Sequence, residues 1–282
     1  MILVFGKTGQ VATELQRLGD VIALGRAEVD LSVPQTCVAA IKGHSPKAVI
    51  NAAAYTAVDK AEEEEPLATL INGKAPRLMA ETCATLGIPL VHISTDYVFE
   101  GTGKTPWRPE DATAPQNTYG RSKLAGEMAI RSSKAVHAIL RTSWVVSAHG
   151  TNFVKTMLRL SETHDKLSVV GDQIGGVTPA RDIAATCLEI AKQLTQDPSK
   201  SGTYHFSGSP NVSCADFAKE IFAQAGRTVA VTPIPTADYL TPSKRPLNSR
   251  MECTSTAQVF GIARPNWRDG LKMILQELED SK

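Results

Sequence analysis

A tyrosine and a lysine stand four positions apart in the segment YGRSK, residues 119–123. At this spacing on a helix both side chains lie on one face, one turn apart. A nearby ammonium group stabilises a phenolate, so we expect Lys123 to lower the pKa of Tyr119 toward neutrality. Such a phenol can donate or accept a proton at physiological pH. A helical tyrosine near a lysine is common by chance, so the pair needs further groups beside it.

A hydroxyl and a carboxyl group, those of Thr95 and Asp96, follow the apolar segment 90–94. If residues 90–94 form a strand of a parallel sheet, these side chains lie where ligands bind in such folds, beyond the carboxyl ends of the strands. The structural alternative for Thr95 is a cap of the following turn. A hydroxyl, a tuned tyrosine and a lysine beside a nicotinamide would form a site for carbonyl reduction.

A glycine-containing turn follows the first apolar segment of the chain. Residues 2–5 are typical of a buried parallel strand, residues 10–18 have helical spacing, and GKTGQVA lies between them. Glycines there permit a sharp turn and let backbone N–H groups approach a phosphate at the helix N-terminus. A P-loop fails on spacing, because the glycine it needs five residues upstream is a methionine. With a structural turn as the alternative, we predict a dinucleotide site at Gly6, Gly9, Gln10 and Val11.

The second apolar segment, residues 21–24, ends beside Arg26. NAD-binding folds usually place an acidic residue at this point, whereas a guanidinium can hold the 2′-phosphate of NADP. We therefore predict NADPH as the cofactor, and Glu28 leaves NADH open. Asp30 and Leu31 are placed at the adenine edge.

Strands and helices alternate through the first half of the chain. Apolar segments at 2–5, 21–24, 48–54, 90–94 and 138–142 alternate with helical spacing over 10–18, 35–43, 67–86 and 119–132. This order predicts an α/β fold with a doubly wound parallel sheet of the Rossmann type. After residue 145 the pattern weakens, and segments 161–176 and 228–250 are rich in Pro, Gly and Thr. We predict a dinucleotide-binding domain over 1–146 with a returning segment near 178–206, and a smaller irregular C-terminal substrate lobe formed by 147–177 and 207–282.

The composition argues against several other classes of protein. Of the 282 residues, 42% are hydrophobic and the net charge is +1, which gives no electrostatic footprint for nucleic acid or a membrane. Five scattered cysteines without a CxxC fit reduced thiols. The first residues lack a signal-peptide pattern and no apolar stretch approaches ~18 residues, so we expect a cytoplasmic protein. The histidines lack metal-ligand spacing and no GxSxG occurs, while the acidic residues 62–65 fit a solvated helix start.

Longer segments carry a more specific resemblance. They are FGKTGQV at 5–11, NAAAYTAVDKAE at 51–62, STDYVF at 94–99, YGRSKLAGE at 119–127, RTSW at 141–144, GDQIG at 171–175 and RPLNSR at 245–250. Over nearly the whole chain they resemble the extended short-chain dehydrogenase/reductases, and within them the dTDP-4-dehydrorhamnose reductase family. The resemblance implies NAD(P)H-dependent reduction of the C4 ketone of dTDP-4-dehydro-L-rhamnose, with a nucleotide sugar as the partner.

The same resemblance implies roles for individual residues. Thr95 would bind the sugar oxygen, Tyr119 would protonate it, and Lys123 would tune the tyrosine and hold the nicotinamide ribose. The expected cofactor positions further along the chain are Ala52, Ala53, Ala54, Thr142 and Ser143. The expected substrate positions are Asp96, Trp144, Asn152, Gln173 and Arg245, with Asn248 more suited to structuring its loop.

The sequence also leaves alternatives open. Some members of the family form dimers through magnesium held by glutamates, and Glu14 and Glu189 are counterparts if this chain is a homodimer of that kind. A dehydratase lacks its base here, because residue 97 is Tyr where those enzymes commonly carry Glu. An epimerase is harder to exclude. A non-catalytic NADP-binding regulatory subunit could dispense with the tyrosine, so Tyr119 and Lys123 together favour an enzyme.

Overall fold

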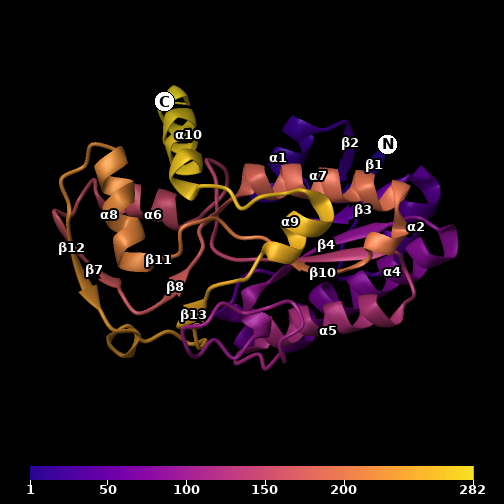
Figure 1. Ribbon diagram of the computed structural model, residues 1–282, viewed down its shortest axis with the longest axis horizontal. Coiled ribbons are helices and arrows are strands. Elements are labelled where there is room, and N and C mark those ends of the chain that lie inside the picture. Colours follow the sequence, from indigo (N-terminus) through magenta and orange to yellow (C-terminus); the bar gives the residue numbers. More distant parts are fainter. Residues whose placement is uncertain (282) are drawn as a thin grey trace.

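The computed structural model describes residues 1–281, and its centre is a six-stranded sheet in the order β10-β5-β4-β3-β1-β2 (Figure 1). Its strands are β1 (Ile2–Phe5), β2 (Val21–Leu24), β3 (Ala48–Asn51), β4 (Leu90–Thr95), β5 (His137–Thr142) and β10 (Gly202–His205). All neighbouring strands are parallel. The predicted doubly wound α/β fold is therefore confirmed.

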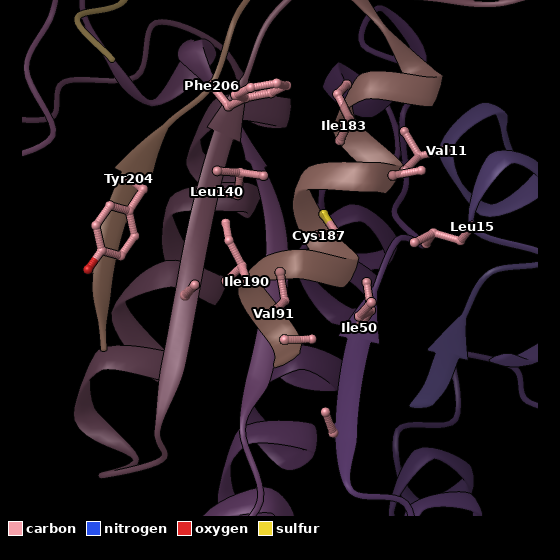
Figure 2. Packing of buried hydrophobic residues seen from close by; sticks show 14 of the residues in the cluster. Val11, Leu15, Ile50, Val91, Leu140, Ile183, Cys187, Ile190, Tyr204 and Phe206 are labelled. Atoms are coloured by element: carbon pink, nitrogen blue, oxygen red, sulfur yellow. The ribbon is translucent and has the colours of Figure 1, made fainter. Parts of the chain in front are cut away.

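Helices cover both faces of this sheet because its strands are apolar on both sides. One face packs against α1 (Gln10–Leu18), α7 (Ala180–Gln196) and α9 (Thr254–Phe260), and the other against α2 (Gln35–His44), α4 (Ala75–Leu86) and α5 (Thr118–Ser132). Figure 2 shows the first of these layers, where Ile183 and Cys187 of α7 pack over Ile50, Val91 and Leu140 of the strands. Two continuous cores thus hold the strand ends in fixed positions.

Two predicted elements differ in detail from the structure. The third strand ends at Asn51, so residues 52–54 lie beyond it. The predicted helix 67–86 consists of α3 (Glu65–Thr69), a π-helical segment η2 (Leu70–Lys74) and α4. Pro76 explains the interruption, because it has no N–H to donate to the carbonyl four residues earlier.

The remaining part of the chain lies to one side of the sheet (Figure 1). Its helices are α6 (Phe153–Leu160), α8 (Cys214–Gln224) and α10 (Trp267–Asp280). Its strands are β6 (Val145–Val146), β7 (Lys166–Val170), β8 (Ile174–Gly175), β9 (Thr178–Pro179), β11 (Val212–Ser213), β12 (Ala230–Ile234) and β13 (Asn248–Ser249). A third apolar core, centred on Phe217 and Trp267, holds these elements together.

Segments 161–176 and 228–250, expected to be irregular, contain short strands that pair over long sequence distances. β7 pairs with β12, and β8 lies between β11 and β13. Strands of two to five residues leave no measurable alternation in the sequence. Within the described residues, no helix has both the length and the apolar character needed to cross a membrane.

Candidate active site

The expected catalytic residues come from the end of β4 and the start of α5. Asn117 caps α5, since its side chain accepts a hydrogen bond from the N–H of Gly120 at 2.8 Å. Tyr119 therefore lies in the first turn, with Lys123 one turn further along, buried against β4. Glu62 supports this helix start by accepting hydrogen bonds from the N–H and hydroxyl of Thr118. The acidic segment 62–65 is thus more than a solvated helix start.

The hydroxyl of Thr95 lies beside Tyr119. The Thr95 hydroxyl donates to Asp96 Oδ1 at 3.1 Å and accepts from the N–H of Tyr97 at 3.2 Å. The Tyr97 ring meets the Tyr119 ring edge-on, with 5.5 Å between centroids. The structure therefore brings Thr95 and Tyr119 together around Tyr97, and the turn-capping alternative for Thr95 is also realised.

The pKa of Tyr119 differs from the sequence-based expectation. Burial raises it and the charge of Asp96 adds to this effect, while a hydrogen bond with Thr95 opposes them. The expected lowering by Lys123 is wrong for the protein without cofactor. The reason is that Lys123 Nζ donates to the carbonyl oxygen of Ile93 at 2.7 Å.

Lys123 belongs to a buried polar chain. Its Nζ lies 3.3 Å from His92 Nε2, and His92 Nδ1 lies 3.0 Å from Asn51 Nδ2. Burial lowers the pKa of Lys123 to about 8, against the opposing charge of Glu127. Burial also holds the pKa of His92 well below its ordinary value, with the charge of Lys123 adding to this.

Asp96 is a buried carboxyl group with an incomplete set of partners. Burial raises its pKa to about 6, although contacts with Ser249 and Thr95 favour the charged form. By geometry, neither Asp96 Oδ2 nor Ser249 Oγ has a hydrogen-bond partner among residues 1–281. Ser249 therefore lies beside the Asp96 carboxyl group, and each side chain has a buried oxygen that is suited to a ligand.

The glycine turn has the shape that a dinucleotide needs. Gly6 has a φ of +113°, and a Cβ there would lie 3.3 Å from both Ala12 Cβ and the carbonyl carbon of Ala52. Gly9 caps α1 without a side chain, and within the described chain a Cβ on it would meet nothing within 4 Å. The open N-terminus of α1 therefore fits a phosphate.

The other residues expected in this turn have different surroundings. Gln10 Oε1 accepts hydrogen bonds from the Ser147 hydroxyl and from Asn152 Nδ2, both at 2.9 Å. The Val11 side chain packs in the core, so only its backbone faces the turn. Asn152, expected near the substrate, caps α6 and binds Gln10 instead of projecting freely.

The end of β2 presents an exposed cation. The Arg26 side chain is 80% exposed and lies 3.2 Å from Asp30. Asp30 also accepts from the N–H and hydroxyl of Ser32, whereas the Leu31 side chain is buried in the core. Glu28 pairs with Lys7 at 2.6 Å, which leaves Arg26 as the accessible guanidinium at this strand end.

Two expected substrate residues, Arg245 and Trp144, approach the strand ends from the side of the lobe. Arg245 Nη2 donates to Asp59 at 2.7 Å and its charge also acts on Tyr97. Its buried Nη1 lacks a partner in the part of the chain that the structure describes. Trp144 and Ser249 both pack on Gly175, where a Cβ would come within 3.0 Å of each.

Gln173 and Asn248 make contacts within loops. Gln173 donates to the Thr236 hydroxyl at 3.2 Å. Asn248 Nδ2 donates to the carbonyl groups of Thr102 and Thr105, as expected for a residue that structures its loop.

The end of β5 carries the residues expected on the nicotinamide side. Thr142 is paired in register with Thr95 of β4. Its hydroxyl is buried without a partner in residues 1–281. Ser143 donates to the carbonyl of Gly176 and so joins the end of β5 to the lobe.

The two glutamates expected to hold magnesium lie in different surroundings. Glu189 pairs within its own helix, α7. Glu14 instead groups with His149 and Glu277, with ligand atoms within 4.8 Å of one another. Arg17 Nη1 lies within this group, 2.7 Å from Glu277 and 3.1 Å from His149. Because a guanidinium supplies the positive charge there, these residues do not fit the expected magnesium site.

Several residues of this region were missed from the sequence. They are Asn51 and His92 beside Lys123, Glu127 and Arg141 behind it, and Ser249 beside Asp96. His92 and Arg141 each stand within an apolar strand, and a polar residue at such a position is itself a signal. Ser249 carries no such signal, because its place depends on the pairing of β13 with β8.

Comparison with known proteins agrees with this geometry. The profile of the RmlD substrate binding domain family matches residues 1–280. The chain is 42% identical to a dTDP-4-dehydrorhamnose reductase from Sinorhizobium fredii, over 98% of this chain and 97% of that protein. A protein of the same name from Escherichia coli K12 is 41% identical, with the same coverage.

Solved structures are similar over almost the whole length. A dTDP-4-dehydrorhamnose reductase from Clostridium acetobutylicum superposes with a TM-score of 0.91 at 36% identity, covering 99% of both chains. One from Bacillus anthracis in complex with NADP gives a TM-score of 0.90 at 33% identity, covering 98% of both chains. A Brucella ovis UDP-glucose 4-epimerase, 16% identical with a TM-score of 0.81, shares the fold.

Proposed function

The chain belongs to the RmlD substrate binding domain family of NAD(P)H-dependent oxidoreductases, and on this premise we propose that it reduces the C4 ketone of dTDP-4-dehydro-L-rhamnose to give dTDP-L-rhamnose. The observation that carries the proposal is the meeting of Thr95 and Tyr119 at the carboxyl end of β4. Relatives about 40% identical over nearly the full length, each named for this reaction, support the choice of substrate.

We assign Tyr119 as the proton donor to the C4 oxygen. Burial raises the pKa of Tyr119, so its hydroxyl keeps its proton at neutral pH and can release it as negative charge develops on the substrate. The Thr95 hydroxyl donates a hydrogen bond to the same oxygen, which stabilises that charge. Lys123 holds the nicotinamide ribose and adjusts the tyrosine.

NADPH is the proposed cofactor, and it supplies hydride when bound. Its diphosphate lies on the open N-terminus of α1, at Gly6, Gly9, Gln10 and the backbone of Val11. Arg26 binds the 2′-phosphate, and Asp30 and Leu31 border the adenine. Residues 52–54 and Thr142 border the ribose and nicotinamide, where small side chains leave room. We also propose that residues 1–146, with 178–206, form the cofactor domain.

The substrate binds between this domain and the lobe. Four buried atoms without partners among the described residues support this placement: Asp96 Oδ2, Ser249 Oγ, Thr142 Oγ1 and Arg245 Nη1. A hydroxylated sugar offers donors and acceptors to such atoms, and Arg245 suits the diphosphate. Trp144 packs beside the sugar, while Asn152 and Gln173 support the loops around it.

The proposal is tested by following NADPH absorbance with dTDP-4-dehydro-L-rhamnose generated in situ. Tyr119→Phe should bind NADPH normally and lose about 100- to 10,000-fold in turnover, because only the proton donor is removed. Tyr204→Phe is the matched control, since Tyr204 lies on β10 at the edge of the sheet and its hydroxyl donates to the Lys200 carbonyl. Normal turnover by Tyr119→Phe would contradict the assignment. NADPH binding without turnover by the unmodified enzyme would instead favour a regulatory subunit.

A further inference from the structure

We propose that Asn51 and His92 are positioning residues that direct an imidazole N–H, rather than a lone pair, at the amino group of Lys123. The inference rests on the proposed function only for the importance of Lys123. The contact between His92 and Lys123 is present in the protein without ligands. All three side chains are buried, on two neighbouring strands and the helix that covers them.

The orientation of the Asn51 amide is the first step. Asn51 Oδ1 accepts a hydrogen bond from the N–H of Ala53 at 3.2 Å. The other end of the amide, Nδ2, then faces His92 Nδ1 at 3.0 Å. An amide nitrogen can only donate, so His92 Nδ1 must accept and carries no proton.

The tautomer of His92 follows from this contact. A neutral imidazole has one N–H, which must then lie on Nε2. Burial keeps the pKa of His92 well below its usual value, so the ring stays neutral at physiological pH. The Nε2 atom and its proton face Lys123 Nζ at 3.3 Å.

The tautomer of His92 affects the charge of Lys123. An ammonium group has only N–H donors and would oppose the N–H of His92. A neutral amine can accept from His92 through its lone pair and still donate to Ile93 O at 2.7 Å. The geometry thus lowers the proton affinity of Lys123 in the free enzyme, in the same direction as burial.

Other charged groups near Lys123 act in different ways. Glu127 on its own helix favours the ammonium form. Arg141 of β5 neutralises much of that carboxylate through two hydrogen bonds. His137 of β5 acts on His92. Asp96 acts on Tyr119, so its titration is a separate event.

Asn51→Asp reverses the contact. The introduced carboxylate can only accept, so it draws the imidazole proton to Nδ1 and leaves a lone pair on Nε2 for the ammonium form of Lys123. We expect the proton affinity of Lys123 to rise about tenfold or more. The limb of the kcat/KM pH profile that reports Lys123 should move to higher pH by about one unit for each tenfold rise, because kcat/KM reports groups of the free enzyme.

Nitrogen-15 NMR of His92 in the ligand-free wild-type enzyme is the decisive measurement, with His92→Gln used for assignment. A proton on Nε2 is expected, and a proton on Nδ1 would overturn the proposal whether or not any variant folds. Carbon-13 NMR of labelled lysine then follows the titration of Lys123, assigned with Lys123→Arg. Neither measurement uses substrate, so failure here is distinct from failure of the Tyr119→Phe test.

Asn72→Asp is the matched control for added charge. Asn72 is buried beside α5, and its amide nitrogen donates to the Ser122 hydroxyl at 2.9 Å and to the Tyr55 carbonyl at 3.0 Å, not to His92. A carboxylate there adds the same charge near the helix without altering the tautomer. A smaller rise in the proton affinity of Lys123 than in Asn51→Asp is expected. An equal rise in both variants would show a general field effect and contradict a positioning role.

Discussion

The region around Glu127 and Arg141 and the region around Asp96 and Ser249 differ in how their buried polar groups are paired. Glu127 of α5 accepts hydrogen bonds from Arg141 at 2.9 and 2.7 Å and from the Ser94 hydroxyl at 2.6 Å. Both charged side chains are at most 2% exposed. At the end of β4, by contrast, Asp96 Oδ2 and Ser249 Oγ have no such partners in residues 1–281. The first arrangement stabilises the scaffold, and the second is suited to a ligand.

The pKa values of Glu127 and Asp96 shift in opposite directions. Burial by itself raises the pKa of Glu127, but the hydrogen bonds and charge of Arg141 outweigh it and leave the pKa lowered. Among residues 1–281, Asp96 has no cationic partner of that kind, so burial raises its pKa to about 6. The free enzyme is therefore less stable at neutral pH because of Asp96, at the place proposed above for the substrate, and such local destabilisation is common at functional sites.

Glu127→Gln should have the largest effect among the variants that test this difference. It should lower the free energy of unfolding by about 3 kcal/mol, because it leaves the Arg141 charge buried without a counter-ion. Urea unfolding at pH 7 measures the loss. In the wild type this stabilisation is present above the unfolded-state pKa of about 4.3 and disappears as pH falls through the lower folded-state value. A loss below about 1 kcal/mol would mean that the pair does not support the scaffold.

Asp96→Asn should act in the opposite direction on stability. The folded pKa of about 6 lies above the ordinary value of 3.8, so the wild type loses stability as pH rises through that interval. At pH 7 the amide should recover about 1–3 kcal/mol, and the gain should vanish below about pH 4. Thermal unfolding across this pH range checks the sign, and a raised KM should accompany the gain. A destabilised variant would show that the Asp96 carboxylate is well paired after all.

Local patterns in the sequence predicted the scaffold well. The apolar segments 2–5, 21–24, 90–94 and 138–142 form strands with bounds close to those expected, because each alternates with a helix and ends at a turn. The meeting of Thr95 and Tyr119 was predictable because parallel strands expose their carboxyl ends at one edge. The resemblance then fixed the family, which the profile over residues 1–280 confirms.

The electrostatics of the site required tertiary structure. The spacing of Tyr119 and Lys123 correctly indicates one helix, but the lysine donates to Ile93 of the neighbouring strand, which no spacing within the helix shows. The place of Ser249 depends on a two-residue strand paired with β8. The position of Arg17 among Glu14, His149 and Glu277 joins segments far apart in the chain.

Ser249→Ala should have the smallest effect, and it is the most specific test of the region around Asp96 and Ser249. Its hydroxyl has no partner in the described protein, so removing it should leave unfolding unchanged and raise KM about three- to tenfold, the value of one hydrogen bond to substrate. Ser255 on α9 also has a buried hydroxyl without a partner there, and Ser255→Ala should change neither quantity. A substrate analogue that lacks the sugar hydroxyl bound by Ser249 should bind the wild type and Ser249→Ala equally. If both serine variants changed KM alike, an unpaired buried hydroxyl would not distinguish the ligand site from the rest of the interior.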